Sequence, residues 1–318
     1  MRRITFCLSL VLLAVTLSVT AQKVTFVPQW TPQAQFAGFY VAQDMGFYAD
    51  EGLDVDIVHV GLHSSESSFD MLESGRAQIV GMHTLQSIIE RSSGSDIVNV
   101  MQITQKTGLC CVSHSPIKSV SDLNGKKLGK WKSGFYELCA ILANRENISV
   151  EWVPFVGSGV NLYAYGAVDA TLCYSYSELV RLRLAVGDIP EENILRFSEL
   201  GYNIPEDALV VSGRYFKKNA DVVRRFVEAS EKGWLWAKEH PAEALKISMK
   251  YVAAAHVVTN DVLEKIMLDE YLKLQVNDRT GVADFAAMSE EVFDGLVEDL
   301  YQNGLIGRKV AYRELIVE

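Results

Sequence analysis

Strand-like and helix-like segments alternate along most of this chain, and the alternation constrains the fold more than any single motif. In the first third, short apolar and β-branched runs at 23–27, 53–60, 77–82 and 96–103 predict strands. Helical patterns lie between them at 31–48, from a cap at Ser64 or Ser65 to Gly75, and at 84–91. Thr31 is the expected N-cap of the first helix, with Pro32 in its first turn. Strands separated by such helices indicate βαβ units around a parallel sheet.

A second alternation follows, with strands predicted at 109–113, 127–130, 149–154 and 170–174 and helices at 133–144 and 160–165. After Gly201 a strand is predicted at 208–212, and then four helices at 220–239, 241–251, 260–274 and 289–302. Asn219 and Ser289 are suitable N-caps, and Gly304 is a suitable C-terminal stop. The pattern therefore predicts two α/β units followed by a helical tail.

Two such units predict an α/β protein with two lobes. We expect residues 22–105 and 206–318 to form the first lobe with its C-terminal helices, and residues 106–205 to form the second. Ligands of open parallel sheets bind beyond the carboxyl ends of the strands, so two facing lobes enclose a ligand cleft. The hinge is expected where the chain crosses between the lobes, at 105–108 and 205–209.

The first residues have the pattern of a cleavable signal peptide, which we assign to residues 1–21. Arg2 and Arg3 precede an apolar run at 4–15, and the small-residue pattern Val19-Thr20-Ala21 follows. An uncleaved membrane anchor is the alternative. The formal charge is −10, and loss of the two arginines with the signal peptide makes it −12. An acidic, exported chain without a basic stripe is not expected to bind nucleic acid, and its field disfavours a strongly anionic ligand.

The expected mature chain keeps four cysteines, Cys110, Cys111, Cys139 and Cys173. Four scattered cysteines in so long a chain do not make a disulfide framework. Adjacent cysteines in a strand point to opposite faces, so Cys110 and Cys111 are not expected to bond to each other. We expect buried thiols, and one disulfide among Cys110 or Cys111, Cys139 and Cys173 is the alternative that the sequence leaves open.

Several motifs follow one another in the order of a known family. They are WTPQAQFAGFYVA at 30–42, GFY at 46–48, EGLDV at 51–55, SGRAQ at 74–78, IKSVSDLNGKK at 117–127, GAVDA at 166–170 and AKEHP at 237–241. With them the chain resembles the periplasmic solute-binding proteins of ABC importers. The matching branch includes nitrate, sulfonate and taurine binders, thiamine-precursor binders and the pyrimidine synthase of thiamine biosynthesis.

The resemblance implies a two-lobed periplasmic-binding-protein fold of type II, each lobe a mainly parallel sheet flanked by helices. It also implies a periplasmic protein that hands a small solute to an ABC permease in the inner membrane. We expect it to act without a cofactor or a metal, and as a monomer. The WTPQ opening and the pair Tyr174 and Glu178 resemble the pyrimidine binders, which suggests a thiamine-precursor aminopyrimidine as the ligand. A sulfonate, taurine or nitrate ligand is the alternative.

An aminopyrimidine offers a flat face and an exocyclic amine beside a ring nitrogen. Aromatic side chains supply stacking at about 0.5 to 1.5 kcal/mol per well-placed pair, and a carboxylate accepts hydrogen bonds from the amine. Glu178 is the expected carboxylate, with Tyr174 one turn before it if the stretch is helical. The alternative for Glu178 is a solvated glutamate paired with Arg181 or Arg183.

The remaining candidate ligand contacts are aromatic or polar residues at strand ends. Trp30 follows a strand, although an apolar contact within the lobe is an equal alternative. Tyr40 is placed in the cleft from the next helix, while Phe36 and Phe39 are assigned to the core. His83 follows a buried strand at the capping position of a helix.

Trp131, Ser133 and Tyr136 occupy the corresponding turn of the second lobe, where a helix start offers free N–H groups.

A synthase of this family is expected to carry a Cys-Cys-Cys-Phe-Cys motif for iron, a lysine that holds pyridoxal phosphate and a histidine that is consumed as substrate. The stretch that aligns with the motif reads YNIPE at 202–206 and holds no cysteine. We therefore expect a binding protein rather than an enzyme. His59 and His63 lie four apart but not on one helix, so we expect surface histidines rather than a zinc site.

Overall fold

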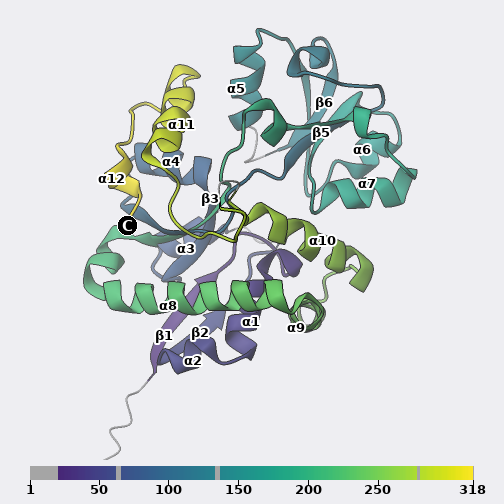
Figure 1. Ribbon diagram of the computed structural model, residues 1–318. Helices are drawn as coiled ribbons and strands as arrows, with labels where there is room; N and C mark the ends of the chain where they lie inside the picture. Colours follow the sequence, from purple (N-terminus) through teal and green to yellow (C-terminus); the bar gives the residue numbers. More distant parts are fainter. Residues whose placement is uncertain (1–20, 62–65, 133–136, 278–279, 318) are drawn as a thin grey trace, which may run out of the picture.

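The computed structural model describes residues 21–61, 66–132, 137–277 and 280–317, which form two α/β lobes (Figure 1). The first sheet has the strand order β2–β1–β3–β10–β4, and the second has the order β7–β6–β8–β5–β9. The chain passes from β4 in the first sheet to β5 in the second, and returns from β9 to β10. Among the described residues, no helix is long and apolar enough to cross a membrane.

Both sheets are mixed, with one inner strand that runs against its neighbours. In the first lobe β1 is parallel to β2 and β3, while β10 is antiparallel to β3 and β4. In the second lobe β6 is parallel to β7 and β8, while β5 is antiparallel to β8 and β9. The strands are β1 Gln22–Val27, β2 Leu53–Ile57, β3 Ile79–His83, β4 Ile97–Gln102, β5 Leu109–Ser113, β6 Lys127–Trp131, β7 Glu151–Phe155, β8 Ala170–Tyr174, β9 Ile194–Arg196 and β10 Asp207–Ser212.

Helices cover the sheets and fill the space beside the first lobe (Figure 1). The α-helices are α1 Ala37–Asp44, α2 Phe47–Asp50, α3 Ser68–Glu73, α4 Thr84–Ser92, α5 Glu137–Arg145, α6 Val160–Ala164, α7 Glu178–Val186, α8 Gly213–Glu239, α9 Pro241–Ala254, α10 Asp261–Leu274, α11 Glu290–Gln302 and α12 Tyr312–Leu315. The 3-10 helices are η1 Ala34–Phe36, η2 Val120–Leu123, η3 Glu191–Asn193 and η4 Phe197–Leu200. The inner strands β3, β8 and β10 are almost wholly buried, as apolar strands covered on both faces should be.

Several helix ends differ from the sequence expectation. Thr31 is not an N-cap, because the chain bends after β1 and turns helical only at η1 and α1. Gly46, with φ of +79°, then separates α1 from α2, since that backbone conformation favours glycine. The caps predicted at Ser64 or Ser65 lie outside the described residues, and α3 is capped instead by Ser67, whose hydroxyl accepts the N–H of Asp70 at 3.1 Å.

Apart from the start of α8, the C-terminal helices begin and end close to the predicted positions. Helix α8 starts before the predicted N-cap Asn219, which sits instead at a kink with φ of −134° and ψ of 30°. Ser289 caps α11 as predicted, and Gly304 adopts φ of +68° after it. Asn260, predicted as the first residue of its helix, is the N-cap of α10.

Helices α1 and α8 cross closely because each helix has a glycine at the crossing, Gly38 in α1 and Gly233 in α8. A Cβ atom on Gly233 would lie 2.1 Å from the carbonyl oxygen of Gly38. A Cβ atom on Gly38 would lie 2.1 Å from Cδ2 of Trp234, whose ring is buried at this crossing. The crossing anchors α8 against the helix that follows the Trp30 loop.

The two lobes also touch away from their connecting passages. Helix α5 of the second lobe lies beside α11 of the first, and α7 lies beside α10 (Figure 1). Arg145 donates to both carboxylate oxygens of Asp299, at 2.6 and 2.8 Å, and Asn144 donates to Asn303 at 2.6 Å. We call these four residues the α5–α11 contact. It joins the lobes in the conformation that the structure shows.

Candidate functional site

The ends of β3, β6 and β8 face one another between the lobes, together with the loop that follows β1. Two adjoining cavities open there and share His83 and Tyr174 as lining residues. The cavity that we call the aromatic pocket has about 420 Å³ of space, part of it open to solvent. It is lined by Gln29, Trp30, Gln33, Gln35, His83, Trp131, Tyr174, Tyr176, Ser177 and Glu178.

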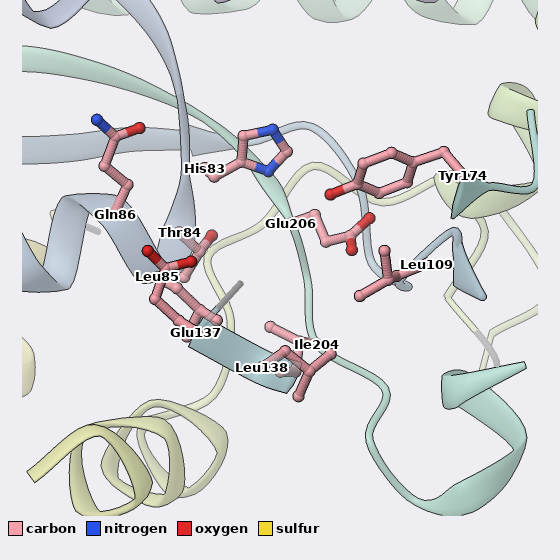
Figure 2. Close-up of a pocket in the computed structure, with 10 residues that line it drawn as sticks. All are labelled: His83, Thr84, Leu85, Gln86, Leu109, Glu137, Leu138, Tyr174, Ile204 and Glu206. Atoms are coloured by element: carbon pink, nitrogen blue, oxygen red, sulfur yellow. The ribbon is translucent and has the colours of Figure 1, made fainter. Parts of the chain in front are cut away.

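The second cavity, which we call the hinge pocket, encloses about 500 Å³ next to the passages between the lobes (Figure 2). It is lined by His83, Thr84, Leu85, Gln86, Leu109, Glu137, Leu138, Tyr174, Ile204 and Glu206. In Figure 2 the hydroxyl group of Tyr174 points toward the His83 ring, and the carboxyl group of Glu206 lies between Tyr174 and Leu109.

Five of the residues predicted to contact a ligand line the aromatic pocket together. Trp30 and His83 come from the first lobe, and Trp131, Tyr174 and Glu178 come from the second. The rings of Trp131 and Tyr174 lie 5.5 Å apart between centroids, which is a normal aromatic contact. Side chains from both lobes therefore converge on one space.

Of the other three predicted residues, only Tyr40 is among the described residues, and it lines neither pocket. Ser133 and Tyr136 lie outside the described residues. The prediction for Tyr40 is wrong, because its side chain is fully buried behind the Trp30 loop. The Tyr40 ring stacks on Tyr251 with centroids 4.0 Å apart. Tyr40 therefore belongs to the buried core, as Phe36 and Phe39 do.

Tyr40 instead supports the Trp30 loop through His59. The Tyr40 hydroxyl lies 2.8 Å from Nε2 of His59, and Nδ1 of His59 lies 2.7 Å from the carbonyl oxygen of Trp30. Burial lowers the pKa of His59 to about 4, so its ring is neutral at pH 7. Nδ1 then donates to Trp30 and Nε2 accepts from Tyr40. The expectation of a surface histidine is wrong for His59, and His63 lies outside the described residues.

Glu178 is the first residue of α7 and faces the aromatic pocket. Its carboxylate accepts the backbone N–H of Tyr174 at 3.1 Å, and burial raises the pKa of Glu178 above its ordinary value. Tyr174 ends β8, so the two residues do not share a helix as the sequence suggested. The alternative pairing with Arg183 is not formed, since Arg183 binds Glu191 at 2.5 Å. A half-buried carboxylate is thus held at the wall of the pocket.

A buried network fixes His83 from behind. Asp207 accepts hydrogen bonds at Oδ2 from Gln35 at 2.9 Å and from the hydroxyl of Tyr271 at 2.6 Å. Its other oxygen lies 3.5 Å from Nδ1 of His83. Burial lowers the pKa of His83 and the charge of Asp207 partly opposes that shift. A neutral imidazole can both donate and accept, so His83 is suited to bind a polar heterocycle.

Glu206 is a pocket residue that sequence reasoning missed. It accepts the hydroxyl of Thr107 at 2.5 Å and the N–H of Gly108 at 3.0 Å, so it ties the returning passage to the outgoing one. Burial raises its pKa to about 8. The signal available in the sequence was an acidic pair, Glu206 and Asp207, at the start of a buried strand within the predicted hinge.

The two lobes, with the cavities between them, have the periplasmic-binding-protein fold. The aliphatic sulphonate binding protein SsuA from Escherichia coli superposes with a TM-score of 0.68 at 15% identity, covering 93% of this chain and 92% of that one. At this identity the likeness concerns the fold. A family model described as NMT1/THI5 like matches residues 33–244, and the chain belongs to this family.

Named relatives share between a fifth and a third of their residues with this chain. A riboflavin-binding protein RibY of Chloroflexus aurantiacus is 28% identical over 278 residues, which is 82% of this chain and 75% of the relative. A formylaminopyrimidine-binding protein of Halalkalibacterium halodurans is 27% identical over 228 residues, covering 69% and 67%. A Saccharomyces cerevisiae 4-amino-5-hydroxymethyl-2-methylpyrimidine phosphate synthase, THI13, is 23% identical over 263 residues, covering 78% and 75%.

Proposed function

We propose that this protein is the exported solute-binding component of an ABC importer and that it captures a thiamine-precursor aminopyrimidine in the aromatic pocket. The observation that carries the proposal is the convergence of Trp30, Trp131 and Tyr174 from two lobes around the carboxylate of Glu178. The relative named for formylaminopyrimidine binding supports the same class of ligand.

Each part of the pocket has a role toward such a ligand. The aromatic rings supply flat apolar faces for the pyrimidine, and the carboxylate of Glu178 accepts hydrogen bonds from its exocyclic amine. His83, held in place by Asp207, supplies a neutral group that can donate to or accept from a ring nitrogen. Because these groups belong to different lobes, binding favours the closed arrangement, which a permease in the inner membrane can then recognise.

The test uses the mature protein and 4-amino-5-hydroxymethyl-2-methylpyrimidine in calorimetry and thermal unfolding. At a ligand concentration 100 times Kd, the free energy of unfolding should rise by about 2.7 kcal/mol. Glu178→Gln should weaken binding roughly ten-fold or more, since a hydrogen bond to a charged group is worth about 1.5 to 3 kcal/mol, and Glu178→Ala should abolish it. Glu192→Gln, on an exposed residue of the same lobe, is the matched control and should bind like the wild type.

If taurine or another sulfonate stabilises the protein and the pyrimidine does not, the assignment of an aminopyrimidine as the ligand is wrong. The proposed solute-binding function would not be affected by that result. Absence of any response to pyrimidines, sulfonates and flavins would contradict the binding function itself.

A flat polycyclic ligand such as riboflavin is a second candidate, and the hinge pocket favours it. Leu85, Leu109, Leu138 and Ile204 give that pocket an apolar lining next to the aromatic pocket. A fused ring system could extend past His83 and Tyr174 into it, and one relative is named for riboflavin binding. Leu138→Trp should fill the hinge pocket and block a flavin while it leaves a single pyrimidine ring unaffected. Quenching of flavin fluorescence measures this directly.

The alternative of a different class is an enzyme that makes the pyrimidine from pyridoxal phosphate and histidine, as the name of the yeast relative indicates for that protein. A lysine aldimine of pyridoxal phosphate absorbs visible light. After dialysis to remove pyridoxal phosphate that is loosely attached to surface lysines, a binding protein should retain no such band, and a band that persists at one equivalent per chain would contradict our proposal.

A further inference from the structure

Two cysteines of the second lobe lie directly opposite each other on neighbouring strands. Cys110 on β5 is the register partner of Cys173 on β8, in an antiparallel pair. Their Sγ atoms are 3.3 Å apart, and both side chains are buried. The two residues have no role in the proposed function.

The backbone geometry of this pair suits a disulfide. Directly opposite residues of antiparallel strands have Cα atoms about 4.5 or 5.5 Å apart, depending on their hydrogen bonding. Disulfides span Cα separations of about 4.4 to 6.8 Å, so either case falls inside the range. The sulfur atoms must approach by about 1.3 Å to reach bonding distance, which side-chain rotation can supply without a shift in register.

The surroundings select this pair over Cys111, the neighbour of Cys110 in sequence. Cys110 and Cys173 pack in a small apolar cluster on one side of the sheet, with Val112 and Leu182. Cys111 belongs to the main core on the other side and is the register partner of Leu172. Alternation along the strand therefore keeps Cys111 away from the Cys173 sulfur.

We propose that Cys110 and Cys173 form a structural disulfide when the protein folds in an oxidising compartment. Two S–H bonds break and one S–S bond forms, and the two electrons and two protons pass to a disulfide oxidant, such as oxidised glutathione or a thiol–disulfide oxidoreductase in its disulfide form, which becomes two thiols. Burial raises the pKa of Cys173, so the folded thiol reacts slowly and the bond forms during folding. The predicted signal peptide would lead to such a compartment.

The bond would fasten β5 to β8 directly behind the cleft. The next register pair along these strands is Leu109 with Tyr174, and both line the hinge pocket. The disulfide would also close a long loop of chain, from β5 through β6 and β7 to β8, and long loops gain most from closure in the unfolded chain.

The experiment refolds the mature protein in a glutathione redox buffer, traps remaining thiols by alkylation and maps the peptides by mass spectrometry. We expect a cross-link that joins the Cys110 peptide to the Cys173 peptide. Cys111→Ala should keep the cross-link and Cys110→Ala should lose it, which assigns the bond to one of the two adjacent cysteines. A wild-type map in which Cys110 and Cys173 are both alkylated overturns the proposal.

Thermal unfolding supplies a second readout that does not depend on peptide mapping. Dithiothreitol should lower the Tm of the oxidised wild type by about 5 °C or more. The double variant with Cys110→Ala and Cys173→Ala should show no such response to the reductant. Equal sensitivity of both proteins to dithiothreitol would contradict a stabilising bond at this site. Ligand binding is not needed for either readout, so the result is independent of the proposed function.

Discussion

Glu206 joins the two passages between the lobes through one side chain. Its carboxyl group accepts from Thr107 and Gly108 on the outgoing passage while its own backbone belongs to the returning one. Its N–H is in turn bound by the hydroxyl of Thr104 at 3.1 Å. The same carboxyl group lines the hinge pocket. One residue therefore both joins the two passages and forms part of the pocket wall.

The raised pKa of Glu206 predicts a pH-dependent stability. The folded protein holds the proton up to a pH of about 8, whereas an unfolded glutamate loses it near 4.5. The contribution of the Glu206 side chain to the free energy of unfolding is therefore fully present below pH 4.5, and it is lost as the pH rises through about 8. We expect the difference in free energy of unfolding between wild type and Glu206→Gln to shrink and then reverse in favour of the variant over this window. Denaturant unfolding at a series of pH values checks this, and parallel pH profiles for the two proteins would contradict it.

At the residue scale, the sequence predicted positions at strand ends better than positions inside helices. His83 and Trp131 follow from the rule that strand ends line the cleft, because that rule depends only on topology, whereas Tyr174 and Glu178 came from the family resemblance. Tyr40 was misplaced because helical spacing alone does not say which face of α1 meets the core. Glu206 was missed because its importance comes from a contact with Thr107, far away in the sequence.

At the element scale, the crossing of α1 and α8 depends on the absence of a side chain. The carbonyl oxygen of Gly38 occupies the space that a Cβ atom on Gly233 would need. Backbone cannot yield as a flexible side chain can, so a methyl group there must push the helices apart. The Trp234 ring packs against the same crossing and would move with α8.

Gly233→Ala should therefore destabilise the protein by about 1 to 3 kcal/mol, the usual range for overpacking. Gly295→Ala in α11 is the matched control, since a Cβ atom there meets nothing within 4 Å and the position is exposed. Alanine should stabilise that helix by up to about 1 kcal/mol. The two variants should shift Tm in opposite directions, and an equal shift would show that the crossing tolerates a methyl group.

The sequence predicted every described strand except β9 within a few residues, since their apolar runs are bounded by turn residues. Strand β9 was missed because a segment of three residues carries no clear periodic pattern. Helix α7 was not predicted as an element, and α8 was expected to start after Asn219 rather than at Gly213. At α8, tertiary packing carries the helix through Asn219, where the local signal favours a new helix start.

At the scale of the whole molecule, the α5–α11 contact joins the lobes beside the returning passage, where the Arg145 guanidinium lies 5.0 Å from the centre of the Tyr202 ring. Its ion pair between Arg145 and Asp299 is partly exposed, so it contributes modestly. A contact that exists only while the lobes are together adds its free energy to the closed arrangement alone. It therefore adds to the affinity for any ligand that the closed lobes enclose.

Arg145→Ala should weaken ligand binding by up to about five-fold without contacting the ligand, which corresponds to the usual range for an exposed ion pair. Arg224→Ala removes a comparable exposed arginine that pairs within α8 alone, and its Kd should match the wild type. Calorimetry at low and high salt measures Kd for both variants. The effect of Arg145→Ala on Kd should be smaller at high salt, whereas Arg224→Ala should have no effect at either salt concentration. Equal affinities of the wild type and Arg145→Ala for the ligand would show that the α5–α11 contact does not stabilise the closed arrangement.

The position of β10 also constrains the order in which the lobes can be completed when the chain emerges N-terminus first into the compartment where it folds. β10 lies between β3 and β4, yet it emerges only after every strand of the second sheet. When β4 emerges it has no neighbour in its sheet, whereas the second lobe is encoded without interruption from β5 to β9. The later-encoded lobe can therefore finish folding first, while the N-terminal lobe remains open until residue 212 is available.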